Sequence, residues 1–309
     1  MTSPTDAPVT RRATDRRGEL VGSFFSVVMA CSFAVVVILG KEVQAGRLPF
    51  VMLAIRFGGQ SVLLFGALVL LGRPLLPERG ERKWVALAGL IGYGSESALY
   101  FSALNHGSAA AVTLLFYTYP VWVMLVTIGF DRKAPPRALF AALGLALIGS
   151  VVVVLGGGNA DLTSIGIVLA IATSFAYTAY LVTTDRTVKR TDPLTAAAWL
   201  GLGAATANLV YAFAFNAVFV PPIGQWWRLA GMALFSAAAF AAMLAGLQRV
   251  GAVRNSIIGV MEPLTVAVLA YVFLSEPVTE AVAVGGTLIL GGAVIASLVR
   301  TTSVAEPNV

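Results

Sequence analysis

Ten long apolar stretches, separated by short polar breaks, constrain this chain more than any other feature. A helix that crosses a bilayer needs about 20 mostly apolar residues, and each stretch has about that length. Their apolar character is continuous, whereas the strands of a membrane barrel alternate polar and apolar residues. The stretches lie at roughly 20–40, 50–72, 84–104, 109–130, 137–155, 164–184, 194–216, 227–247, 252–273 and 279–299. The sequence therefore predicts an all-α integral membrane protein with ten transmembrane helices.

Composition excludes the main alternatives to a membrane protein. Hydrophobic residues make up 58% of the 309 residues and charged residues only 12%, whereas soluble domains are about 25% charged. Folded in water, such a chain would expose apolar patches that soluble proteins do not tolerate. This excludes a soluble enzyme, a disordered protein and an ordinary nucleic-acid binder. The single cysteine, Cys31, excludes a disulfide framework within the chain and a cysteine-based zinc site.

Both ends of the chain are polar, and we expect residues 1–18 to be a disordered cytoplasmic tail and residues 301–309 to be a cytoplasmic tail. Four arginines precede the first apolar stretch, which raises the alternative of a cleaved signal peptide. The stretch continues to Leu39, beyond the 7–15 residues of a signal core. A retained helix is therefore the favoured interpretation.

The basic residues indicate how the chain lies in the membrane. Of its 21 lysines and arginines, 17 lie in or beside one alternating set of loops and tails, and 3 lie in the opposite set. Cytoplasmic loops carry the excess of positive charge. We therefore expect a multi-pass protein of the cell membrane with both termini in the cytoplasm.

The two halves of the chain match at a constant offset of 143 residues, without a gap. The identities include Gly58 with Gly201, Trp84 with Trp227, Pro120 with Pro263, and Gly149 with Gly292. This pattern predicts two five-helix repeats at residues 19–156 and 157–300. Because five is odd, the second repeat must enter the membrane inverted, a plan that recurs in secondary transporters. Chance identity among helices rich in glycine and alanine is the alternative.

Two segments carry a family resemblance, NHGSAAAVTLLFYTYPVWVMLV and RVGAVRNSIIGVMEPLTVAVLAYVFLSEP. With the ten spans and the repeat, they make the chain resemble the EamA-type transporters of the drug/metabolite transporter superfamily. In the second segment, small residues precede Pro263, and Glu276 and Pro277 follow at the helix end. The first segment departs from the pattern, since Asp131 and Lys133 stand where a helix-ending glutamate is expected. The resemblance implies small polar or amphipathic metabolites or drugs as substrates, often exported.

Three charged residues, Arg56, Glu96 and Glu262, lie deep inside the expected spans. A charge at the centre of a membrane helix costs about 2.5–3.5 kcal/mol on insertion scales, and such residues normally face the bundle interior or a water-filled path. Arg56 and Glu96 lie at similar depths, so they are candidates for an ion pair that either locks the bundle or binds substrate. Glu262 is a candidate for binding a cationic group or a coupling proton. A neutral, hydrogen-bonded structural carboxyl is the alternative.

Several polar and aromatic residues share helix faces with these charges. Tyr93 and Tyr100 lie on the face of Glu96, and Asn255 on that of Glu262, by helical spacing. Tyrosine offers an apolar ring and a hydroxyl, so the further candidates for a pocket wall, with ordinary packing as the alternative, are Tyr117, Tyr177 and Tyr180. Pro120 and Pro263 are expected to kink their helices without contacting a ligand.

These observations predict a secondary active transporter, an exporter of small metabolites, amino-acid-like compounds or drugs that works by alternating access. Its expected partners are a small-molecule substrate and the lipid bilayer, without nucleic acid, enzymatic activity, metal or cofactor. The oligomeric state stays open, and a monomer suffices. The alternatives are a lipid or sugar-lipid flippase, a channel or receptor, and, on Ser95 with the distant His106, an intramembrane protease.

Overall fold

The computed structural model describes residues 16–44, 48–107, 109–132, 134–156, 162–274 and 279–299. Within these ranges the regular structure is helical, apart from an isolated bridge between Gly107 and Leu162. Residues 16–18, expected in the polar tail, already belong to the first helix. The rest of both tails, with Lys133, Glu276 and Pro277, lies outside the described residues.

The first half of the chain builds five spans. The third is made of two α-helices joined by a π-helix, and the fourth of two α-helices. In chain order the elements are α1 (Arg16–Gln44), α2 (Phe50–Leu70), α3 (Arg82–Leu87), η1 (Ala88–Tyr93), α4 (Gly94–Ala103), η2 (Leu104–His106), α5 (Ala109–Phe116), α6 (Tyr119–Asp131) and α7 (Arg137–Leu155). The sequence did not predict the π-helix η1, a form that often occurs at functional sites.

The second half repeats this plan with α8 (Ser164–Thr187), α9 (Pro193–Ala214), η3 (Ile223–Gln225), α10 (Trp226–Gly259), α11 (Met261–Leu274) and α12 (Glu280–Leu298). The long helix α10 holds the eighth span and the start of the ninth, and its backbone turns at Gly251, which has a φ of 76°. Among the residues that the structure describes, eight helices are long and apolar enough to cross a membrane. The other two of the ten expected spans are the third, which η1 divides, and the ninth, which α10 and α11 share.

Helix boundaries recur at the offset found in the sequence. The helix α7 begins at Arg137 and ends at Leu155, and α12 begins at Glu280 and ends at Leu298, 143 residues later at both ends. The same offset relates the ends of α5 and α10. The two halves are therefore structural repeats of five spans each, as predicted.

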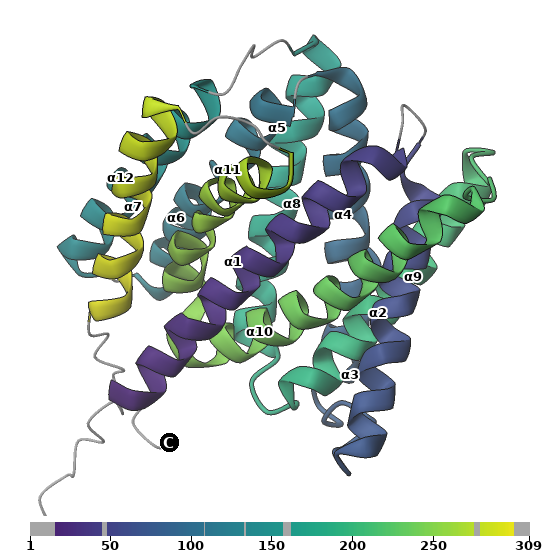
Figure 1. The fold of residues 1–309 in the computed structure, drawn as a ribbon. Coiled ribbons are helices and arrows are strands. Elements are labelled where there is room, and N and C mark those ends of the chain that lie inside the picture. The colour runs from purple at the N-terminus through teal and green to yellow at the C-terminus, as the bar shows by residue number, and fades with distance from the viewer. Residues whose placement is uncertain are drawn as a thin grey trace, which may run out of the picture.

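Corresponding helices of the two repeats pack against each other. Figure 1 shows α7 beside α12 at one edge of the bundle and α2 beside α9 at the opposite edge, with α1 and α10 between them. A pseudo-twofold axis between inverted repeats brings equivalent helices into contact where they lie next to the axis. The remaining helices, including the broken spans, surround the space between the two edges.

The crossing of α7 and α12 depends on glycine. A Cβ atom added to Gly285 would lie 2.6 Å from the carbonyl oxygen of Gly149, and one added to Gly292 would lie 2.6 Å from that of Ala142. The repeat offset converts the first contact into the second, so this crossing follows the pseudo-twofold axis. Small residues allow such close approach of helices in lipid.

We expect Gly285→Ala to lower the stability of the protein by about 1–3 kcal/mol, because the new methyl group forces two backbones apart. Gly291→Ala is the matched control on the same helix, since a Cβ atom there meets nothing within 4 Å. Thermal unfolding in detergent measures both. Equal unfolding temperatures for the two variants would show that the crossing tolerates a side chain.

Candidate functional site

Spans four and nine break at equivalent positions, each one turn before a proline. The helix α5 ends at Phe116, four residues before Pro120, and α10 ends at Gly259, four residues before Pro263. Because proline has no N–H, it cannot donate to the carbonyl four residues earlier. The carbonyls of Phe116 and Gly259 therefore lose their helical partners at the points where the chain bends.

A cavity of about 50 Å³ lies beside these breaks. It has room for a few water molecules. Both repeats contribute to its wall, with α1, α2, η1, α4, α5 and α6 from the first and α8, α10 and α11 from the second. The lining residues are Met29, Phe33, Val36, Val37, Arg56, Tyr93, Glu96, Ser97, Tyr100, Phe101, Phe116, Tyr119, Tyr177, Gly259 and Glu262.

Arg56 supplies the positive charge of this cavity and is only 3% exposed. Its Nε–H donates to Ser236 Oγ on α10 at 2.6 Å, and its guanidinium carbon lies 4.7 Å from the centre of the Phe57 ring. Glu96 and Glu262 line the same cavity.

The expected direct ion pair between Arg56 and Glu96 is not formed. Within the described part of the chain, no carboxylate comes within the 4.0 Å that defines an ion pair with Arg56. The reason lies in the packing, because α2 contacts α10 more extensively than it contacts α4. The guanidinium of Arg56 therefore donates its hydrogen bond to Ser236 on α10.

The two carboxylates approach the cavity from different repeats. Glu96 is 4% exposed, and its Oε2 accepts a hydrogen bond from Ser97 Oγ at 3.1 Å. Glu262, in the first turn of α11, is half-buried and lines the cavity. With both carboxylates ionised, the described lining carries one more negative than positive charge. Because a buried charge is costly without a partner, this arrangement favours the entry of a cation or a proton.

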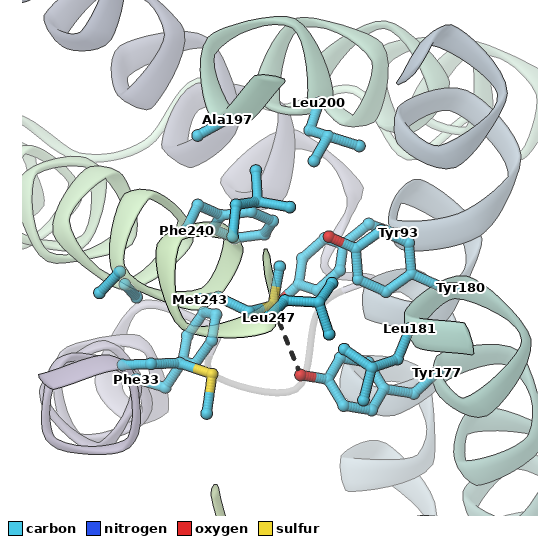
Figure 2. Packing of buried hydrophobic residues seen from close by; sticks show 14 of the residues in the cluster. Phe33, Tyr93, Tyr177, Tyr180, Leu181, Ala197, Leu200, Phe240, Met243 and Leu247 are labelled. Carbon is cyan, nitrogen blue, oxygen red and sulfur yellow. Dashed lines mark hydrogen bonds between the residues drawn. The ribbon is translucent and has the colours of Figure 1, made fainter. Parts of the chain in front are cut away.

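Aromatic rings form the apolar wall. Figure 2 shows Tyr93 and Tyr180 side by side near Phe240, and Tyr177 directed at Met243. The ring of Tyr93 lies 4.4 Å from that of Phe240 and 5.3 Å from that of Tyr180, and the Tyr177 hydroxyl contacts the Met243 sulfur at 3.7 Å. Edge-to-face contacts of this kind stabilise ring clusters and hold their orientation.

The candidate residues from the sequence divide into two groups. Six line the cavity: Arg56, Tyr93, Glu96, Tyr100, Tyr177 and Glu262. The remaining three lie behind the wall. Tyr180 packs against Tyr93, and Tyr117 packs against Phe116. Asn255 accepts a hydrogen bond from Ser26 Oγ at 2.7 Å, which ties α10 to α1.

Sequence reasoning missed Tyr119 and Ser236. Tyr119 lines the cavity and donates a hydrogen bond to the Ser256 carbonyl at 3.2 Å. A continuous helix would put Tyr117 on the cavity face, but the break after α5 changes which residue reaches it. The run Phe-Tyr-Thr-Tyr before Pro120 was the available signal for Tyr119. No local signal distinguished Ser236 from the other small residues of α10.

Known proteins resemble this chain along most of its length. The model of the EamA-like transporter family matches residues 20–155 and again residues 164–298. An uncharacterized transporter, YcbK of Bacillus subtilis (strain 168), is 30% identical over 231 residues, which cover 70% of this chain and 73% of that protein. An uncharacterized transporter of Archaeoglobus fulgidus is 28% identical over 272 residues, covering 87% and 94% of the two chains.

A solved structure, described only as the crystal structure of a protein, has the same fold. It superposes with a TM-score of 0.76 over 91% of this chain and 96% of its own, at 21% identity. The family matches span both repeats and agree with the helical architecture. The chain therefore belongs to the EamA-like transporter family, as a multi-pass membrane transporter of small molecules and not an enzyme.

Proposed function

We propose that this transporter is a secondary active exporter of small metabolites, amino-acid-like compounds or drugs, and that its substrate passes through the cavity between the two repeats. The observation that carries this proposal is the charged and aromatic lining, drawn from both repeats, beside the two equivalent helix breaks. Substrate sites of inverted-repeat transporters lie at the repeat interface and use discontinuous helices. An ion or substrate gradient supplies the driving force.

The symmetry of the fold supports alternating access as the mechanism. Two similar halves exchange shapes, so that the cavity opens first to one side and then to the other. The breaks after Phe116 and Gly259 provide equivalent bending points, one in each repeat. Glu262 lies in the first turn of the helix beyond one of these breaks, so bending at that point would move a charge that lines the cavity.

We also propose that both termini lie in the cytoplasm, because the loops on that side of the membrane carry the excess of lysine and arginine. On that side, polar contacts join the two repeats. Arg73 pairs with Asp192 at 2.7 Å, and Arg186 pairs with Asp131 at 2.7 Å. Each of these exposed pairs contributes little stability. Both pairs join a residue of the first repeat to a residue of the second repeat, so they connect the ends of the repeats on this side.

Transport by purified protein in liposomes tests this proposal. Labelled amino acids, nucleosides and drugs are followed under pH, sodium and substrate gradients, with protein-free liposomes as the control. We expect saturable movement of at least one class. Current without saturation would indicate a channel, and movement of a fluorescent lipid alone would indicate a flippase. Absence of movement under every gradient would contradict the carrier.

A further inference from the structure

A second cavity lies at the end of the bundle where α1 begins and α12 ends (Figure 1). Its volume is about 300 Å³, at the lower limit of the range of about 300–1,000 Å³ for small-molecule sites. The described residues of its wall are Arg16, Glu19 and Leu20 on α1, and Ser297 and Leu298 on α12. None of them lines the cavity between the repeats, so the proposed transport path does not account for this space.

The charged groups around this second cavity carry a net positive charge. Arg16 is exposed on its wall. The carboxylate of Glu19 lies 3.6 Å from the guanidinium of Arg254, whose side chain is only 1% exposed. The same guanidinium donates to the carbonyl of Val299 at the end of α12. Because Arg254 offsets the charge of Glu19, the charge of Arg16 remains in excess in the described wall, and an anion fits this cavity better than a cation.

The cavity also borders an apolar surface of two helices that are long and apolar enough to span a membrane. Leu20 is 44% exposed and Leu298 is 60% exposed, and Phe24, one turn further along α1, is 63% exposed. Exposed apolar side chains on such helices are stabilised by contact with acyl chains instead of water. An occupant of the cavity can therefore place a polar group beside Arg16 and an apolar chain along α1.

We propose that this cavity binds the headgroup of an anionic phospholipid of the phosphatidylglycerol type, with its phosphodiester on Arg16 and an acyl chain along Leu20 and Phe24. Guanidinium groups bind phosphate oxygens through charge-assisted hydrogen bonds, and basic pockets between membrane helices bind anionic lipid headgroups. The lipid fills a gap between α1 and α12, which contact each other far less than α1 contacts α10. This site is independent of the transported substrate.

Four additives separate the parts of this ligand: dioleoyl phosphatidylglycerol, the phosphatidylethanolamine and phosphatidylcholine with the same chains, and glycerol 3-phosphate, which has no chains. Each is added to the whole chain after delipidation in a nonionic detergent, and thermal unfolding reports binding. We expect phosphatidylglycerol to stabilise most, because it alone combines a net negative charge with acyl chains. Equal stabilisation by either zwitterionic lipid, or by glycerol 3-phosphate as a soluble phosphate ester, would overturn the proposal.

Arg16→Ala tests the charge. The concentration of phosphatidylglycerol that gives half-maximal stabilisation should rise about fivefold, the contribution typical of one basic residue at an anionic lipid surface. Arg16→Lys keeps the charge and should retain most of the effect. Arg79→Ala is the matched control, because Arg79 is an exposed arginine of the loop before α3 and lies outside the described wall. Equal concentrations for Arg16→Ala and Arg79→Ala would place the lipid elsewhere and overturn the proposal.

Ser297→Phe tests the cavity itself, because a phenyl ring takes up volume there without changing the charge. The hydroxyl of Ser297 donates to the carbonyl of Ala293 within α12 at 2.7 Å. Thr287→Phe is the matched control, since Thr287 is exposed on the same helix and donates in the same way to Ala283 at 2.8 Å. We expect Ser297→Phe to abolish the preference for phosphatidylglycerol over phosphatidylcholine and Thr287→Phe to retain it. A preference retained in both variants would overturn the proposal.

Discussion

Glu262→Gln is expected to lower transport at least tenfold and to remove most of its dependence on pH. The substitution keeps the size of the side chain and removes the only charge that the second repeat contributes to the described cavity lining. It leaves Glu96 as the single counter-charge to Arg56, so the cavity loses its excess of negative charge. A tenfold loss corresponds to about 1.4 kcal/mol, a modest value for a charge in a buried site.

Initial rates in liposomes from pH 5.5 to 8.5 measure this effect, with the amount of inserted protein determined in parallel. Glu280→Gln is the matched control, because Glu280 is an exposed residue at the start of α12, away from the cavity. Kinetics of Glu262→Gln that coincide with those of Glu280→Gln at every pH would reject a transport role for Glu262.

Glu81→Ala is expected to lower the free energy of unfolding by about 3 kcal/mol, the loss of several hydrogen bonds to a charged group. Glu81 lies in the loop before α3 and is buried. Its Oε1 accepts from the backbone N–H groups of Lys189 and Arg190 at 2.9 and 2.8 Å. Its Oε2 accepts from the N–H and the hydroxyl of Thr191 at 2.9 and 2.6 Å. Alanine leaves these donors without their acceptor and separates the loops of the two repeats.

Thermal and denaturant unfolding in detergent measure the loss, with Glu78→Ala as the control because Glu78 is exposed in the same loop. When the loops of the two repeats are no longer joined through Glu81, cavity residues should also become more accessible from the cytoplasmic side. Labelling of a cysteine introduced at Ser97, compared with and without Glu81→Ala, reports that change. Unfolding curves that match those of Glu78→Ala would contradict a structural role for Glu81.

The Glu81 contribution should depend on pH in a defined direction. Burial alone would raise the pKa of Glu81, but hydrogen bonds from the Thr191 hydroxyl and from three backbone N–H groups outweigh it and lower the pKa below the ordinary value of 4.5. Because the pKa of Glu81 is lowered in the folded state, the stabilisation that Glu81 provides is complete at pH values above its ordinary pKa. It declines as the pH falls from there through the folded pKa. The difference between wild type and Glu81→Ala should therefore be constant near neutrality and shrink only in acid.

The sequence predicted the architecture well because its determinants are local or periodic. Twenty apolar residues specify a span wherever they occur, and a constant offset revealed the repeat. The site was harder to predict because its contacts join distant segments. Ser236 meets Arg56 only through the packing of α10 on α2, and Tyr119 reaches the cavity only because a helix breaks before it. Helical spacing put Tyr93, Glu96 and Tyr100 on one face, and all three line the cavity. It could not foresee the break after α5, which brings Tyr119 to the cavity in place of Tyr117.

The glycine crossing between α7 and α12 has a mechanical consequence. Points on a twofold axis stay in place when the two halves trade conformations. In the proposed exchange of conformations, the crossing at Gly149 and Gly285 would therefore stay in place while the other helices move around it. A rotation about this fixed crossing would displace each loop in proportion to its distance from the axis.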